Sequence, residues 1–190
     1  MAKAGIVYAG SEQGLFIVSD PGGTGRWRQR AHTLQGQPVL AIAALHALSL
    51  LVLIKHTGLL QSSDGGQTWQ PLRSSEDGAA IAADVPQGAP LIASNSLMIQ
   101  LAGEPDVLLA CDGTSLVRSD SQGRHWHTVL WHELLQGHIS VVVPSTYHPD
   151  GAWAGTDAGQ LLRSDDRGRQ WQQVVAGLPP LYSLAVVRLA

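Results

Sequence analysis

Short apolar runs separated by turn residues recur along the chain in four units. Such runs, bounded by Gly, Asp and Ser, are typical of β-strands. The first and second runs of the units lie at 8–12, 51–55, 108–112 and 153–157, and at 15–18, 59–61, 116–118 and 161–163. The third runs, at 27–29, 69–72, 126–129 and 171–175, alternate between apolar and polar residues. That alternation is typical of a half-exposed outer strand, so the pattern predicts an all-β chain.

A fourth, more uniformly apolar run precedes the first run of three units, at 39–45, 96–101 and 139–143, and ends the chain at 183–189. Because these runs are apolar on both faces, we expect them to form the innermost strands. The run at 183–189 precedes no unit of its own. We expect it to pair with 8–12 and complete the first unit, which removes an open strand edge.

A polar box lies between the second and third runs of each unit, at 19–27, 62–69, 119–126 and 164–171. The serines that begin the boxes are separated by 43, 57 and 45 residues. A period of about 40 to 50 residues with four short strands is typical of the blades of a β-propeller. We therefore expect one domain over 1–190, a small β-propeller of about four blades.

The interval of 57 residues is longer than the other two, and its surplus falls in 74–93. Two apolar runs, 79–83 and 90–93, flank the turn-like segment 85–89. This arrangement predicts an inserted hairpin. A degenerate fifth blade over the same residues, or a dimer of half-rings, stays open as an alternative.

The boxes resemble the Asp-box, or BNR, repeat of sialidases, sortilin-type Vps10 domains and propeller-shaped photosystem assembly factors. The family pattern S-x-D-x-G-x-T-W is matched at Ser62, Asp64, Gly66, Thr68 and Trp69. The fourth box matches the pattern at Ser164, Asp166, Gly168 and Trp171, with Gln170 replacing Thr. The third box matches at Ser119, Gly123 and Trp126, with Ser121 replacing Asp. The first box keeps Trp27 but has Pro21 in the Asp position. The resemblance implies a fold over nearly the whole chain, with the boxes on the rim opposite the sialidase active site.

The box residues are those that a tight turn needs. A short carboxylate accepts hydrogen bonds from the backbone N–H groups of its own turn, Gly adopts positive φ, and Trp fills the space against a neighbouring unit. We therefore interpret Asp64 and Asp166 as turn residues rather than as catalytic acids or metal ligands.

Sialidase chemistry is not favoured. The Arg-Ile-Pro sequence of that family is absent, and the three tyrosines, Tyr8, Tyr147 and Tyr182, are explained by packing. We assign no catalytic residue, and if the chain is an enzyme we expect a glycoside hydrolase. A carbohydrate-binding protein is the alternative function, with Trp131 and Trp153 as stacking platforms.

The residues seven positions before the box serines are Glu12, Lys55, Asp112 and Asp157. Each ends the first run of its unit, so we expect all four on one rim, opposite the boxes. Three acids and one lysine there suit a cation, an amine or a basic partner segment, with Trp131 as an additional contact. Solvated turn residues are the alternative interpretation.

Four histidines, His125, His127, His132 and His138, fall close together, but no third ligand is specified with His125 and His127. We therefore interpret these histidines as part of a polar rim that is sensitive to pH near neutrality, with a zinc or copper site as the alternative, and we predict no metal site and no cofactor. The segment 130–135 between them is apolar enough for a short helix or lid. Cys111 is the only cysteine, which excludes an intrachain disulfide and a cysteine-based zinc site.

Composition narrows the function further. The chain is 44% hydrophobic with a net charge of −3, so it can bury a core and lacks the basic stripe that nucleic acids require. No apolar run is long enough to span a membrane, and no secretory signal begins the chain. We expect a soluble cytoplasmic protein that acts as a non-catalytic interaction or assembly scaffold through the rim opposite the boxes. Its partner would be another protein or a glycan, with self-association possible.

Overall fold

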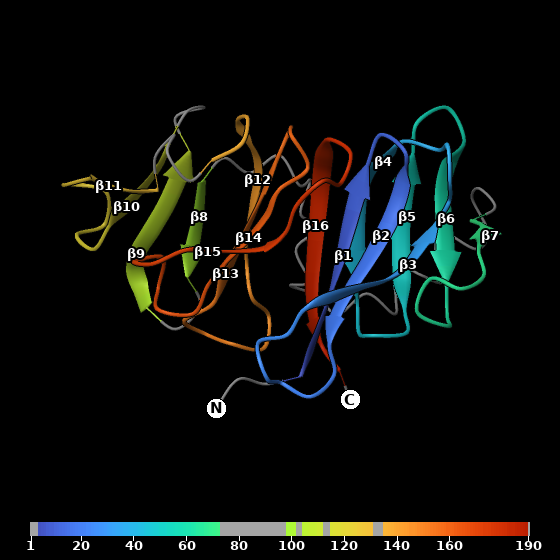
Figure 1. Cartoon of the computed structure of the whole chain (residues 1–190), viewed down its shortest axis with the longest axis horizontal. Helices are drawn as coiled ribbons and strands as arrows, with labels where there is room; N and C mark the ends of the chain where they lie inside the picture. The colour runs from blue at the N-terminus through green and yellow to red at the C-terminus, as the bar shows by residue number, and fades with distance from the viewer. Residues whose placement is uncertain (1–3, 73–97, 102–103, 112–114, 131–134, 190) are drawn as a thin grey trace.

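The chain is described by a computed structural model that covers residues 4–72, 98–101, 104–111, 115–130 and 135–189. Within these ranges it forms β-strands and no helix, arranged as four four-stranded antiparallel sheets (Figure 1). Each sheet carries one of the predicted units. This is the arrangement of a small β-propeller, in which each sheet is a blade.

Within each sheet, the strands follow one another from an innermost to an outermost strand. The first sheet runs outward from β16 (Leu181–Arg188) through β1 (Gly5–Ser11) and β2 (Gly14–Asp20) to β3 (Arg28–Thr33). The second runs from β4 (Val39–Ala44) through β5 (Leu50–Ile54) and β6 (Gly58–Ser62) to β7 (Gln70–Pro71). The third runs from β8 (Met98–Leu101) through β9 (Glu104–Cys111) and β10 (Leu116–Ser119) to β11 (His127–Leu130). The fourth runs from β12 (Ile139–Pro144) through β13 (Ala152–Thr156) and β14 (Leu161–Ser164) to β15 (Gln172–Val175).

The two ends of the chain share the first sheet, as predicted. β16 pairs antiparallel with β1, in a register that joins Val7 to Val186 and Gly5 to Arg188. The register shifts once, between Gly10 and Ser11. The pairing gives β1 a hydrogen-bonded neighbour on each side, so the first blade has no exposed inner edge at β1.

One detail of the strand prediction is wrong. The pattern places the box tryptophans at the start of the third strands, but each of these strands begins one residue after its tryptophan. The indole N–H groups of Trp69, Trp126 and Trp171 donate to the carbonyl of the glycine three residues earlier. These tryptophans therefore belong to the box turn, where the indole closes the turn instead of continuing the strand.

The innermost strands order the sheets in space. β16 contacts β4 on one side and β12 on the other, and β12 contacts β8. The second, first, fourth and third sheets therefore follow one another in a row (Figure 1). Three clusters of buried apolar side chains fill the structure, and the first of them joins β1 and β2 to β12 and β13.

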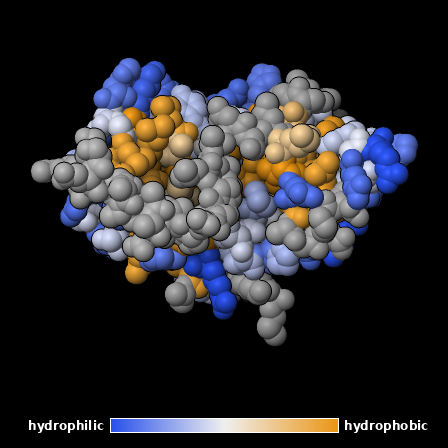
Figure 2. Space-filling view, turned by 180° about the vertical axis from the view of Figure 1, so that it is seen from behind, coloured by the Kyte–Doolittle hydropathy of each residue, from blue (hydrophilic) through white to orange (hydrophobic). Residues whose placement is uncertain are grey.

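The strands at the two ends of the row are less buried than those inside it. β12 and β16 are buried at most positions, whereas Leu40 of β4 and Met98 of β8 are 38% and 59% exposed. Figure 2 shows two areas of apolar surface on the back face, one on each side of its centre. The expectation that all innermost strands are apolar and buried on both faces therefore holds inside the row and fails at its ends.

The predicted insert at 74–93 and the segment 131–134, which includes Trp131 and His132, lie outside the described residues, as does Asp112. Within the described part of the chain, no helix is long and apolar enough to cross a membrane.

Candidate functional site

Three of the four predicted rim residues occupy the same backbone position. Glu12, Lys55 and Asp157 directly follow β1, β5 and β13, the strands next to the innermost strands of their sheets, and all three are exposed. Each donates its backbone N–H to the residue just before the innermost strand of its own sheet: to Pro180 at 3.4 Å, to Pro38 at 3.0 Å and to His138 at 2.9 Å. We call this edge, formed by the loops that carry Glu12, Lys55 and Asp157, the loop rim. The boxes lie at the other ends of the strands.

Glu12 and Lys55 line one pocket. The cavity has a volume of about 410 Å³ and is completed by Pro38, Leu40 and Tyr182. Glu12 and Tyr182 come from the first sheet, whereas Pro38, Leu40 and Lys55 come from the second. This cavity, which we call the rim pocket, therefore combines a carboxylate, an ammonium group and a phenol with an apolar wall.

Leu40 and Tyr182 were missed in the sequence. Both are the second residue of an innermost strand, in β4 and β16 respectively. The equivalent residue of β12 is Ser140, whose hydroxyl donates to the carbonyl of Leu181 at 2.6 Å. The sequence signal for Leu40 and Tyr182 is therefore a large side chain at the second position of an innermost strand, where a small residue such as Ser140 hydrogen-bonds to the neighbouring sheet.

Asp157 is not part of the rim pocket. Its Oδ1 accepts the backbone N–H of His138 at 2.7 Å, and its Oδ2 lies 3.1 Å from His138 Nδ1. Both side chains are about half exposed or more, at 49% and 66%. Gly137 has a φ of 77°, which favours glycine, and a Cβ there would meet Asp157 Oδ1. Asp157 therefore closes its own loop. Of the predicted rim residues that the structure describes, Glu12 and Lys55 lie together in one pocket and Asp157 does not join them.

The second box shows how the carboxylate closes the turn. Asp64 Oδ1 accepts the backbone N–H groups of Gln67 and Thr68, both at 2.9 Å, and the hydroxyl of Ser62 at 2.8 Å. Its Oδ2 accepts the hydroxyl of Thr68 at 2.5 Å. The Thr68 hydroxyl, followed by the other donors, holds the pKa of Asp64 well below its ordinary value. Both oxygens are therefore used by the turn.

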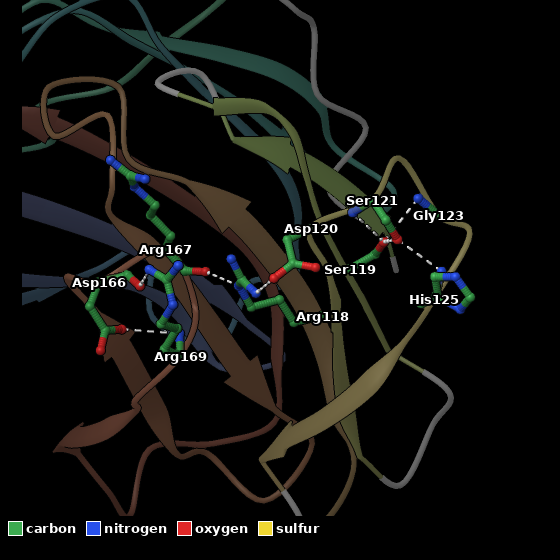
Figure 3. A network of polar contacts seen from close by, with 9 residues as sticks. All are labelled: Arg118, Ser119, Asp120, Ser121, Gly123, His125, Asp166, Arg167 and Arg169. Carbon is green, nitrogen blue, oxygen red and sulfur yellow. Dashed lines mark hydrogen bonds and ion pairs between the residues drawn. The ribbon is translucent and has the colours of Figure 1, made fainter.

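The third box lacks this carboxylate and replaces it with a hydroxyl. Ser121 Oγ accepts the backbone N–H of His125 at 2.9 Å, and Ser119 Oγ accepts that of Gly123 at 2.9 Å (Figure 3). In the first box, Asp20 accepts the backbone N–H of Gly25 at 2.6 Å. The turn is therefore retained in each copy, although the acceptor differs.

Two buried arginines precede the third and fourth boxes, and neither was predicted from the sequence. Arg118 donates from Nη1 to Asp120 at 3.0 Å and from Nε to the carbonyl of Arg167, in the neighbouring sheet, at 2.9 Å (Figure 3). Arg163 occupies the equivalent position and pairs with Asp165 at 2.6 Å. The sequence Arg-Ser-Asp, present at both boxes, is the signal that would have found them.

Trp153 is not a stacking platform. It is 1% exposed, and its ring packs edge-on against Trp27 with the centroids 4.7 Å apart. Trp27 follows the one-residue insertion of the first box, and its indole N–H has no acceptor among the described residues. The ring of Trp27 is buried between two sheets, where it fills space as predicted for a box tryptophan. The interpretation of Trp153 as a sugar platform is wrong because the side chain belongs to the core.

The remaining titratable groups are dispersed. His125 lies in a box turn and His138 on the loop rim, at opposite ends of the strands. In the part of the chain that the structure describes, no three metal-ligating side chains lie close enough together to hold an ion. Tyr8 is buried, and burial raises the pKa of its phenol to about 12. Burial also raises the pKa of Tyr147.

No protein-family model and no curated protein matches the chain. Several solved structures resemble it. YCF48 bound to a D1 peptide is 17% identical, with a TM-score of 0.36, over 75% of this chain and 42% of that one. The GH74 xyloglucanase from Xanthomonas campestris is 21% identical, with a TM-score of 0.36, over 94% and 30% of the two chains. The Niastella koreensis GH74 enzyme is 15% identical, with a TM-score of 0.38, over 94% and 25%. The chain spans less than half the length of each of these structures.

Proposed function

We propose that the chain is a non-catalytic binding module that takes an extended segment of a partner protein into the rim pocket. This proposal rests on the observation that Glu12 and Lys55 line the same cavity, which has a volume of about 410 Å³. A cavity of this size suits one or two side chains of a bound segment. An assembly scaffold of this kind acts by holding its partner rather than by transforming it.

The lining gives the expected partner segment its chemistry. Glu12 and Lys55 are exposed and opposite in charge, so they suit a segment that carries both a basic and an acidic side chain. Leu40 and Tyr182 supply the apolar contact area from which most of the binding free energy would come. A complementary pair of exposed charges adds little affinity, whereas two like charges brought face to face weaken binding strongly, so Glu12 and Lys55 would select the partner and its orientation.

The same lining does not favour glycoside hydrolysis. That reaction generally requires two carboxyl groups about 5 to 10 Å apart, one as acid and one as base or nucleophile. Among the described lining residues of the rim pocket, Glu12 is the only carboxylate. Lys55 is a poor substitute because a protonated ammonium group is neither a base nor a nucleophile.

A random peptide library displayed on phage tests the proposal against the full chain. Selected peptides are expected to combine a basic, an acidic and an aromatic or aliphatic residue. Glu12→Lys and Lys55→Glu should each weaken a selected peptide at least tenfold, which corresponds to about 1.4 kcal/mol. Gln13→Lys is the matched control, because Gln13 is exposed on the same loop as Glu12 but does not line the pocket. The proposal fails if no peptide is selected or if both charge reversals bind as the unmodified chain does.

A further inference from the structure

A second pocket lies on the opposite rim, at the fourth box, and nothing in the proposed function uses it. Its volume is about 220 Å³, and it is lined by Arg163, Asp165, Asp166, Gln170, Trp171 and Gln172. We call it the box pocket. It is formed by one sheet alone, from the end of β14, the box turn and the start of β15.

The replacement of Thr by Gln170 changes the carboxylate at the centre of this box. Asp166 Oδ1 accepts the Ser164 hydroxyl at 2.9 Å and the backbone N–H groups of Arg169 and Gln170 at 3.0 and 2.9 Å. These bonds reproduce those of Asp64 Oδ1. In the second box a threonine hydroxyl also donates to the other carboxylate oxygen, and Gln170 has no hydroxyl. Among the described residues, Asp166 Oδ2 therefore has no donor and is available to a ligand.

The charge of Arg163 is already neutralised within the box pocket. Its guanidinium pairs with Asp165 at 2.6 Å, and its side chain is only 4% exposed. The pair is held in place because the guanidinium also packs against the rings of Trp27 and Trp153 at 5.3 and 5.6 Å. The pocket consequently offers fixed polar groups but no unpaired cation among its lining residues, which disfavours an acidic ligand.

The remaining lining residues supply an apolar wall and adaptable polar groups. The indole N–H of Trp171 donates to the carbonyl of Gly168 at 3.1 Å, and the ring packs against the buried cluster of β9 and β12, so its orientation is fixed. Gln170 and Gln172 are exposed, and each amide both donates and accepts hydrogen bonds. Donors and acceptors therefore surround a partly exposed aromatic ring.

We propose that the box pocket binds a single ring of a neutral sugar. A sugar hydroxyl would donate to Asp166 Oδ2 in place of the missing threonine hydroxyl, and the amides of Gln170 and Gln172 would bind neighbouring hydroxyls. The C–H face of the ring would pack against Trp171. The volume lies below the roughly 300 Å³ at which pockets for larger ligands begin, so one ring is the expected occupant. This site is independent of the rim pocket and of the function proposed for it.

Ligand-observed NMR of the full chain with D-glucose, D-galactose, D-mannose and N-acetyl-D-glucosamine tests the assignment. Saturation transfer to the ring protons of at least one sugar is expected, with a dissociation constant of about 1 mM, since a single ring makes few contacts. Gln170→Thr should restore the hydroxyl bond to Asp166 Oδ2 and weaken sugar binding at least tenfold. Because the same change completes the turn, the variant should be no less stable than the unmodified chain, so loss of binding cannot arise from unfolding.

Gln172→Ala and Gln70→Ala provide the matched pair, because Gln70 and Gln172 each follow the tryptophan of their box. The first change should weaken sugar binding, and the second should leave it unaltered. The proposal is overturned if none of the four sugars receives saturation, or if Gln170→Thr binds as the unmodified chain does. It is also overturned if lysine methyl ester binds and the sugars do not, since the pocket would then be a cation site.

Discussion

The guanidinium carbon of Arg163 lies 5.3 Å from the centroid of the Trp27 ring, and the two residues belong to different sheets. Trp27 ends the first box, whereas Arg163 lies in β14 of the fourth sheet. A box tryptophan thus joins one blade to the next by a cation–π contact. This contact, together with the ion pair to Asp165, accounts for a charged side chain that is nearly inaccessible to solvent at a blade boundary.

Replacing Arg163 by alanine should destabilise the fold by about 2 to 3 kcal/mol. The change removes the packing against Trp27 and Trp153 and leaves a cavity at the boundary. Chemical denaturation monitored by tryptophan fluorescence measures the effect. Arg169→Ala, which removes an exposed arginine of the same box, should cost less than about 0.5 kcal/mol. Equal effects of the two changes would contradict a structural role for the Arg163 contact.

Two glycines of similar backbone conformation should differ sharply in their tolerance of alanine. Gly159 and Gly177 have φ of 76° and 78°. A Cβ on Gly159 would overlap the carbonyl oxygen of Leu178, whereas one on Gly177 would meet nothing within 4 Å. We expect Gly159→Ala to cost about 3 kcal/mol or more, and Gly177→Ala only the backbone strain of about 1 kcal/mol.

Thermal unfolding followed by circular dichroism separates these two effects. For a chain of this length, a loss of about 3 kcal/mol lowers the midpoint by about 6 to 12 °C. The smaller loss corresponds to about 2 to 4 °C. A midpoint for Gly159→Ala as high as that for Gly177→Ala would show that the loop carrying Leu178 moves aside without cost.

Asp64→Asn should lower the urea midpoint at pH 7, and this difference should narrow in acid. The folded-state pKa of Asp64 lies below its ordinary 3.8, mainly because of the Thr68 hydroxyl. The charged carboxylate therefore stabilises the fold above about pH 3.8, and this stabilisation is lost as the pH falls toward the folded-state pKa. Urea titrations at pH 7 and pH 3 provide the measurement.

Asp166→Asn is the matched variant for this experiment. Its carboxylate makes the same Oδ1 hydrogen bonds as Asp64 but receives no threonine hydroxyl. The decrease in midpoint at pH 7 should therefore be smaller than for Asp64→Asn. A larger decrease for Asp166→Asn would show that the backbone N–H donors, rather than the threonine hydroxyl, account for most of the stabilisation by these carboxylates.

Tyr8 should remain protonated to unusually high pH. The phenol donates to the carbonyl of Ala47 at 2.5 Å, and burial raises its pKa from 10.0 to about 12. Between these two values the unfolded chain has released the proton and the folded chain retains it, so stability falls as the pH rises. Ultraviolet absorbance of the phenolate should show a tyrosine that titrates near pH 12. Tyr8→Phe should remove that step and cost about 1 kcal/mol through the lost hydrogen bond.

The repeat pattern determined the fold of this protein to a large extent. The strand order within each unit follows from apolar periodicity, which acts over a few residues. The completion of the first unit by the chain end was predicted by counting the strands of each repeat, although that pairing joins residues far apart in the sequence. The turn role of Asp64 was also predictable, since its partners lie within four residues. Hydrogen bonds between residues so close in the sequence can be predicted from the order of the residues alone.

The sites depended on the tertiary structure. Glu12 meets Lys55 in one pocket and Asp157 does not join them, although the three share a strand position. The difference arises because Asp157 binds His138, whereas Leu40 and Tyr182 complete a pocket beside Lys55 and Glu12. Trp153 was likewise interpreted as exposed because a strand of small and apolar residues does not reveal what packs against it.

The sequence alone therefore determined the repeating unit and its turns. Only the tertiary structure decided which side chains of different units meet, which are covered and which remain accessible. The physical reason is that a strand and its turn are specified by contacts near in sequence. A pocket is specified by the distances between side chains such as Glu12 and Tyr182, which lie at opposite ends of the chain and meet only when the first sheet closes.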